Sequence, residues 1–93
     1  MGPSHAEVLG WDDGNESELA LHRISTVDVE EVFWSNPIWF RNRRYRSGDW
    51  KMLGRTRGGR VLTIVCAWEE DRRTLRPITG WDATDAERKK YLP

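Results

Sequence analysis

Positive charge and aromatic side chains are concentrated in one short stretch, FRNRRYRSGDWK, at residues 40–51. An arginine guanidinium can hold a phosphate group through two parallel N–H donors, and an aromatic ring can stack on a base. The stretch therefore predicts a surface that binds the phosphates and bases of RNA. Its expected binding residues are four arginines and one tryptophan of this stretch, together with a tryptophan near the end of the sequence: Arg41, Arg43, Arg44, Arg46, Trp50 and Trp81.

The charge of the whole sequence allows two other interpretations of this stretch. The formal net charge is zero, yet residues 1–31 hold eight acidic residues and one arginine, whereas residues 32–60 hold eight basic residues and one aspartate. The acidic segment could therefore neutralise the arginines within the fold, or the arginines could bind an acidic partner protein. Neutralisation alone does not explain the interleaved aromatic residues, because salt bridges do not need them.

Lys51 and Arg55 are the first candidates for chemistry at a bound phosphate group, and cleavage of RNA is one such reaction. In cleavage without a metal ion, a protein must help to deprotonate the 2′-OH, stabilise charge on phosphorus and protonate the leaving 5′-oxygen. Arginine suits the second task but is no practical base, because its pKa exceeds about 12, whereas lysine can transfer protons. Lys51 and Arg55 face the same side of a regular strand, and Arg76 could join them from a neighbouring strand. Alternatively, the first two line the solvent face of a sheet, and Arg76 pairs with an acid on the N-terminal helices.

The elements that must position these residues follow from hydrophobic periodicity and from helix-capping and turn residues. Pro77 favours an edge position or a bulge in its strand. The sequence predicts an α+β fold, with a short N-terminal strand, two helices, an antiparallel sheet of three or four strands and a C-terminal helix. The expected strands are 8–11, 38 onwards, 50–56, 60–70 and 74–81; the expected helices are 12–24, 26–35 and 84–92; and a hairpin turn is expected at 57–60.

The length and composition predict a single domain over residues 1–93, with residues 1–6 disordered or left from cloning. No apolar run is long enough to span a membrane, and no signal peptide is evident. Cys66 is the single cysteine and lies in an apolar run, which favours a cytoplasmic protein without a disulfide. The two histidines and the cysteine are far apart in sequence, so neither a metal site nor a cofactor is expected.

Three segments together resemble one protein family. GWDDGNESELALHRISTVDVEEVF resembles the opening of the BrnT toxins, LGRTRGGRVLTIV resembles their glycine–arginine turn and apolar strand, and TLRPITGWDATDAERKKY resembles their closing strand and helix. The segments occur in the family order and extend from residue 9 to residue 91. The sequence departs from the family where Thr79-Gly80-Trp81 stands in place of Ser-Ala-Arg.

The resemblance implies a type II toxin, a ribonuclease with a RelE-like fold. It implies a partner as well, a BrnA-like antitoxin with a ribbon-helix-helix fold that binds DNA. His22 matches a helix histidine of the family and becomes a fourth candidate catalytic residue beside Lys51, Arg55 and Arg76, although a structural role at a helix end is the alternative. The competing hypotheses are a non-catalytic nucleic-acid-binding domain and a protein-interaction domain, for instance a homodimer.

Overall fold

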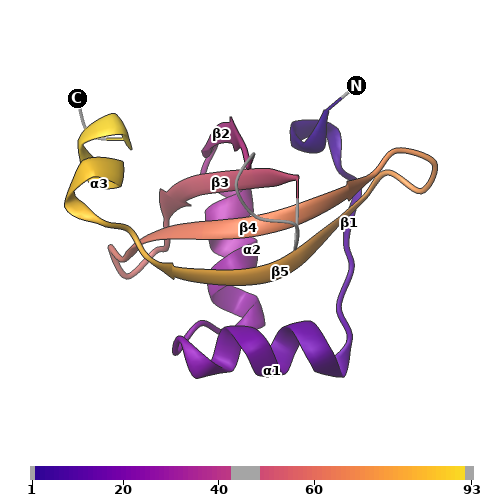
Figure 1. Cartoon of the computed structure of the whole chain (residues 1–93), viewed down its shortest axis with the longest axis horizontal. Helices are drawn as coiled ribbons and strands as arrows, with labels where there is room; N and C mark the ends of the chain where they lie inside the picture. Colours follow the sequence, from indigo (N-terminus) through magenta and orange to yellow (C-terminus); the bar gives the residue numbers. More distant parts are fainter. Residues whose placement is uncertain (1, 43–48, 92–93) are drawn as a thin grey trace.

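The computed structural model describes residues 2–42 and 49–91. Two helices precede a run of four strands, and a third helix follows them (Figure 1). The elements are η1 (Pro3–His5, a 3-10 turn), β1 (Val8–Leu9), α1 (Asp13–Leu21), α2 (Thr26–Trp34), β2 (Ile38–Arg41), β3 (Trp50–Arg55), β4 (Val61–Glu69), β5 (Thr74–Asp82) and α3 (Asp85–Tyr91).

The five strands form one mixed sheet in the order β1-β5-β4-β3-β2. The α+β class is therefore confirmed, but the sheet has more strands than the three or four predicted, and it is not wholly antiparallel. The difference comes from β1, which pairs with β5 in parallel, Val8 opposite Thr74. The register shifts between Val65 and Cys66. That shift leaves Ile78 of β5 without a partner on β4, so the predicted bulge lies beside Pro77.

Helices α1 and α2 begin where side chains can cap them. Asp12 accepts a hydrogen bond from the Asn15 backbone N–H, and the Asn15 side chain accepts one in return from the Asp12 backbone. Ser25 and Asp28 make the same reciprocal pair at the start of α2. Each pair satisfies N–H groups that have no partner inside a helix. The caps therefore fix where α1 and α2 begin, and so how they cross the sheet.

The hydrophobic core lies between one face of the sheet and the two helices α1 and α2. It is formed by side chains that alternate along the strands and by the apolar sides of the helices. Figure 1 shows these two helices together, with α3 standing apart from them. The buried core residues are Leu19, Ile24, Val29, Val32, Phe33, Met52, Leu62, Ile64, Cys66 and Leu75.

The second face of the sheet carries the intervening residues of the central strands. Lys51 pairs with Val65, and Leu53 pairs with Thr63, which in turn pairs with Trp81. Directly paired residues point to the same side of a sheet, and these residues alternate with the core residues. Helix α3 packs over this second face, where it contacts β3. The sheet thus separates the core from a different layer that holds Lys51.

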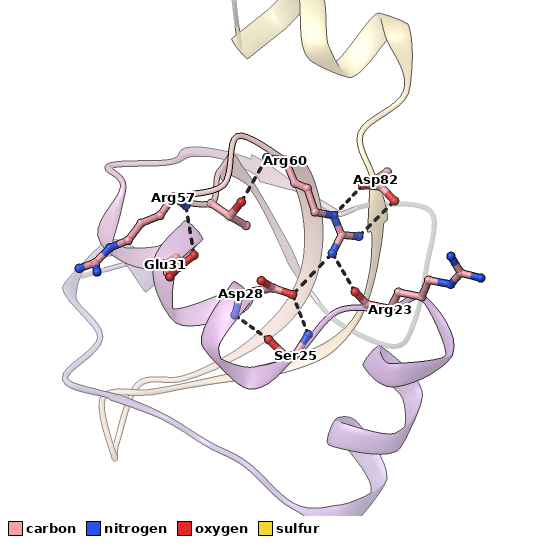
Figure 2. Close-up of polar contacts among 8 residues, drawn as sticks. Arg23, Ser25, Asp28, Glu31, Arg57, Arg60 and Asp82 are labelled. Carbon is pink, nitrogen blue, oxygen red and sulfur yellow. Dashed lines mark hydrogen bonds and ion pairs between the residues drawn. The ribbon is translucent and has the colours of Figure 1, made fainter.

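An arginine after the turn between β3 and β4 joins this hairpin to α2 and β5 (Figure 2). Arg60 donates from Nε and Nη2 to the two carboxylate oxygens of Asp82, both at 3.2 Å, and from Nη1 to the Arg23 carbonyl at 2.8 Å. Its Nη1 also lies 3.5 Å from Asp28 Oδ2. Gly59 precedes it with a φ of 94°, a conformation that glycine adopts without strain. We call this group of contacts the Arg60 clamp.

The N-terminal residues contribute to the structure as far as residue 2. Pro3 is buried, Ala6 packs against the core, and the Glu7 backbone N–H donates to the Arg73 carbonyl at 2.9 Å. Residues 1–6 were predicted to be disordered or left from cloning, but residues 2–6 have a described position in the fold. Within the described ranges, no helix is both long and apolar enough to cross a bilayer.

Candidate active pocket

A small pocket on the second face of the sheet brings together residues from β2, β3, β4 and α3. Its volume is about 160 Å³, which corresponds to roughly five water molecules. We call it the Lys51 pocket. It is lined by Phe40, Arg41, Lys51, Leu53, Thr63, Glu87 and Lys90.

Two ammonium groups and one carboxylate face the Lys51 pocket, because the guanidinium of Arg41 lies over Trp50, on the other face of the sheet from Lys51. Lys90 Nζ lies 5.3 Å from the centre of the Phe40 ring, so this ring holds the ammonium at the side of the pocket. The Lys51 ammonium forms neither a hydrogen bond nor an ion pair with any residue in the described part of the chain. The pocket therefore has an excess of positive charge and an apolar wall, which suits an anionic ligand such as a phosphate group.

Glu87 is the carboxylate of the pocket, and its position is fixed by two donors. Its Oε1 accepts from the Trp81 indole N–H at 3.1 Å and from the Thr84 backbone N–H at 2.8 Å. Partial burial acts to raise the pKa of this carboxyl, but the hydrogen bonds from Thr84 and Trp81 outweigh it and hold the pKa below its ordinary value of 4.5. Glu87 is therefore ionised at neutral pH.

Thr63 forms part of the floor of the pocket. Its side chain is only 2% exposed, and its hydroxyl has no hydrogen-bond partner among the described residues. The hydroxyl nevertheless faces Glu87 closely enough to favour the ionised carboxylate. Thr63 therefore supports the Glu87 carboxylate from within the protein, and its hydroxyl is not accessible to a ligand.

Arg55 does not reach the Lys51 pocket, although the two residues share one face of β3. Four positions separate them, or roughly 13 Å along a strand, and Leu53 lies between them. Arg55 instead lines a larger groove of about 760 Å³ between α2 and the β3–β4 turn, together with Trp34 and Tyr91. Arg55 therefore cannot act on the same phosphate as Lys51 in this structure.

Arg76 and His22, the other two predicted catalytic residues, are engaged elsewhere. Arg76 donates to the Asp12 carboxylate at the start of α1, and its Nε lies 4.0 Å from Glu69. The hydrogen bond from Arg76 lowers the pKa of Asp12, and the same bond raises the pKa of Arg76. His22 follows the last residue of α1, with its Nε2 3.5 Å from Glu18. Arg76 thus pairs with an acid at the start of α1, and His22 lies at the end of α1 beside Glu18.

Two of the six predicted RNA-binding residues, one arginine and one tryptophan, contact each other. The Arg41 guanidinium lies over the Trp50 ring, 4.7 Å from its centre, so this face of Trp50 is already covered. Trp81 lies beside the pocket, where its N–H is bonded to Glu87. Arg43, Arg44 and Arg46 lie outside the described residues. Of the six, Trp81 lies beside the pocket, whereas Arg41 lines it with its guanidinium turned to Trp50.

The sequence did not identify Thr63, Glu87 and Lys90 as site residues. Glu87 was visible in the capping motif of Thr84 to Glu87, but that motif alone indicates only the start of a helix. Its place in the pocket depends on α3 folding back over β3, a tertiary contact that leaves no local signal. Lys90 reaches the pocket through the same contact.

The comparisons with known proteins identify no relative. No model of a protein family matches the sequence, and no curated protein matches it either. Among residues 2–42 and 49–91, no three His, Cys, Asp or Glu side chains form a group that could hold a metal ion.

Proposed function

We propose that this protein is a ribonuclease toxin of the BrnT type, which cleaves RNA in the Lys51 pocket by attack of the neighbouring 2′-OH. The observation that supports this most is the environment of Lys51. Its ammonium lacks a carboxylate partner among the described residues and faces a small pocket that also contains Lys90. A phosphate placed there would meet positive charge from both lysines.

The proposed reaction balances without an added reactant. The 2′-oxygen loses its proton and bonds to phosphorus, the bond from phosphorus to the 5′-oxygen breaks, and the 5′-oxygen takes up a proton. Lys90 stabilises the negative charge that grows on the phosphate oxygens. Lys51 supplies the proton to the leaving oxygen. The products are a 2′,3′-cyclic phosphate and a 5′-hydroxyl.

An antitoxin partner belongs to the same proposal. A BrnA-like antitoxin would inhibit the enzyme by inserting an acidic segment where RNA otherwise binds, because the pocket attracts carboxylates as well as phosphates. Toxin and antitoxin would then meet in the cytoplasm, where the RNA is. Co-expression with the neighbouring gene, followed by purification of the complex, would test this part.

The experiment that tests the proposal is incubation of the purified protein with total RNA in the presence of EDTA. We expect cleavage by the wild type and at least a 100-fold slower rate for Lys51→Ala, because proton transfer by one side chain contributes roughly 10²–10⁴-fold. Lys89→Ala is the matched control, because Lys89 is exposed on α3 and does not line the pocket. Intact RNA with the wild type, or equal rates for the two variants, would contradict the proposal.

A second function, binding of nucleic acid without cleavage, is favoured by one observation. Arg76 and His22, two of the four residues expected to act in catalysis, form ion pairs away from the pocket. A domain of this kind would bind RNA with an affinity that falls steeply with salt. Such binding by wild-type protein that leaves the RNA intact would establish this function in place of the first.

A further inference from the structure

We infer that Glu87 is the group that takes the proton from the 2′-OH, and that Trp81 positions it for this task. The inference rests on the proposed ribonuclease function and assigns a role that the reaction needs and that Lys51, as the proton donor, does not fill. Neither Glu87 nor Trp81 is among the residues that the sequence predicted to be catalytic.

The geometry of the Glu87 carboxylate distinguishes its two oxygens. Oε1 is held by the Trp81 indole and the Thr84 backbone N–H. Oε2 is bound by neither the Trp81 indole nor the Thr84 backbone N–H, while the nearby Thr63 and Thr84 hydroxyls help to keep the carboxylate ionised. Glu87 is also the only carboxylate among the described residues that line the pocket. One oxygen is therefore anchored, and the other can accept a proton from a ligand in the same cavity.

The kind of donor at Oε1 matters for this role. The indole of Trp81 is a donor only, and it carries no charge. It orients the carboxylate without forming an ion pair, in contrast to Asp12, whose carboxylate is bound by Arg76. A carboxylate already paired with a guanidinium would accept a proton less readily. Trp81 thus gives Glu87 a fixed direction and leaves its charge available.

The rest of the pocket complements a base at this place. Thr63, whose hydroxyl is buried, lies beside the carboxylate and helps to keep it ionised. The 2′-OH proton moves to Glu87 Oε2, the 2′-oxygen bonds to phosphorus, and the 5′-oxygen leaves with the proton from Lys51. Acid and base then stand on different elements, Lys51 on β3 and Glu87 on α3.

The pH dependence of cleavage separates this base from a histidine. The charged groups of the pocket that face Glu87 are Lys51 from β3 and Lys90 from α3, both cationic. The hydrogen bonds from Thr84 and Trp81 outweigh burial and hold the pKa of Glu87 below its ordinary value, so the rate should stay on its plateau down to about pH 5. If a histidine were the base, the rate would fall below about pH 6.5, the ordinary pKa of that side chain.

The competing explanation is that Glu87 only caps α3. Glu87→Gln addresses it, because the amide oxygen can still accept from Trp81 and Thr84 but cannot take a proton. Asp85→Asn is the control, because it removes a negative charge from the first turn of α3 and Asp85 does not line the pocket. We expect a fall of about 10²–10⁴-fold in rate for Glu87→Gln, and less than a threefold change for Asp85→Asn.

The experiment measures single-turnover cleavage of a short RNA from pH 4 to pH 8, and binding of the same sequence with a 2′-deoxy residue at the cleaved position. Loss of cleavage with unchanged binding in Glu87→Gln supports the inference, as does an acid limb that moves to higher pH in Trp81→Phe. If Glu87→Gln cleaves like the wild type, or loses binding and cleavage together, the inference is wrong while the ribonuclease function stands.

Two further outcomes are decisive. If the wild type leaves RNA intact, both the function and the inference fail. If Glu87→Gln does not fold, which circular dichroism would reveal, the wild-type profile decides. A plateau down to pH 5 then supports a carboxylate base, and a fall near pH 6.5 overturns it.

Discussion

Replacement of Arg60 by alanine should destabilise the protein more than any other single surface substitution in the same turn. Arg60→Ala removes two hydrogen bonds to Asp82, one to the Arg23 carbonyl and a charge contact with Asp28. The contacts join three segments that are distant in sequence, so their loss loosens the attachment of α2 to the sheet as well as the turn itself.

The magnitude follows from the exposure of the Arg60 clamp. A hydrogen bond to a charged group contributes about 1.5–3 kcal/mol when it is shielded from water, whereas an exposed ion pair contributes about 0.2–1 kcal/mol. The Arg60 side chain is 35% exposed and Asp82 is 67% exposed, but Asp28 is only 26% exposed. We therefore expect a loss of about 1–2 kcal/mol in the free energy of unfolding, and a melting temperature lower by about 4–16 °C in a domain of this size.

Urea unfolding followed by circular dichroism measures this loss, and Arg57→Ala is the matched control. Arg57 lies in the same turn, and its side chain points away from the Arg60 clamp (Figure 2). Its contact with Glu31 uses the backbone N–H, which alanine retains. In 1 M salt, where charges are screened within about 3 Å, the difference between the variants should shrink but persist, because the bond to the Arg23 carbonyl remains. A difference below about 0.5 kcal/mol at low salt would refute the reasoning.

Three further predictions concern packing, reactivity and pH. Gly80→Ala would place a Cβ 2.7 Å from the Ile64 Cδ1 atom, so we expect a loss of about 1–3 kcal/mol in urea unfolding; wild-type stability would contradict it. Cys66 is fully buried and burial raises the pKa of its thiol, so an alkylating reagent should modify it only after denaturant is added. Asp12→Asn should reduce the free energy of unfolding at neutral pH, and this difference from the wild type should disappear as the pH falls below 3.8. The reason is that Arg76 lowers the folded-state pKa of Asp12, and the contribution of the ion pair is lost once the carboxylate is protonated. A difference that persists at pH 2 would contradict the assignment.

Local signals in the sequence were sufficient for most of the elements. The β-branched apolar run at residues 60–70 became β4, and the capping residues Ser25 and Thr84 mark the starts of α2 and α3. These signals depend on neighbours within a few positions. The short strand expected at residues 8–11 forms as β1, but its parallel pairing could not be predicted, because its partner, β5, lies near the other end of the chain.

The candidate site was predictable only in part, for a related reason. The alternation of side chains along a strand placed Lys51 and Arg55 on one face of β3. It did not predict which helix would cover each end of that face. Arg76 was expected near Lys51, yet the parallel pairing of β1 with β5 brings Asp12 beside it instead. In both cases the surroundings of the residue depend on contacts between segments that are distant in sequence, and neither composition nor spacing reveals these contacts.

The same parallel pairing has a consequence for how the molecule folds. Strands β3, β4 and β5 are joined by short connections, so their ladders can form early, whereas β1 must wait until β5 exists and must close a loop that contains most of the chain. Few hydrogen bonds then hold β1, among them Gly10 N–H to the Leu75 carbonyl and Glu7 N–H to the Arg73 carbonyl. Hydrogen exchange should therefore be faster at residues 7–10 than at the centre of β4, with the N-terminal segment opening as a unit of its own. Each such opening uncovers the edge of β5, which is the edge that another extended chain could join.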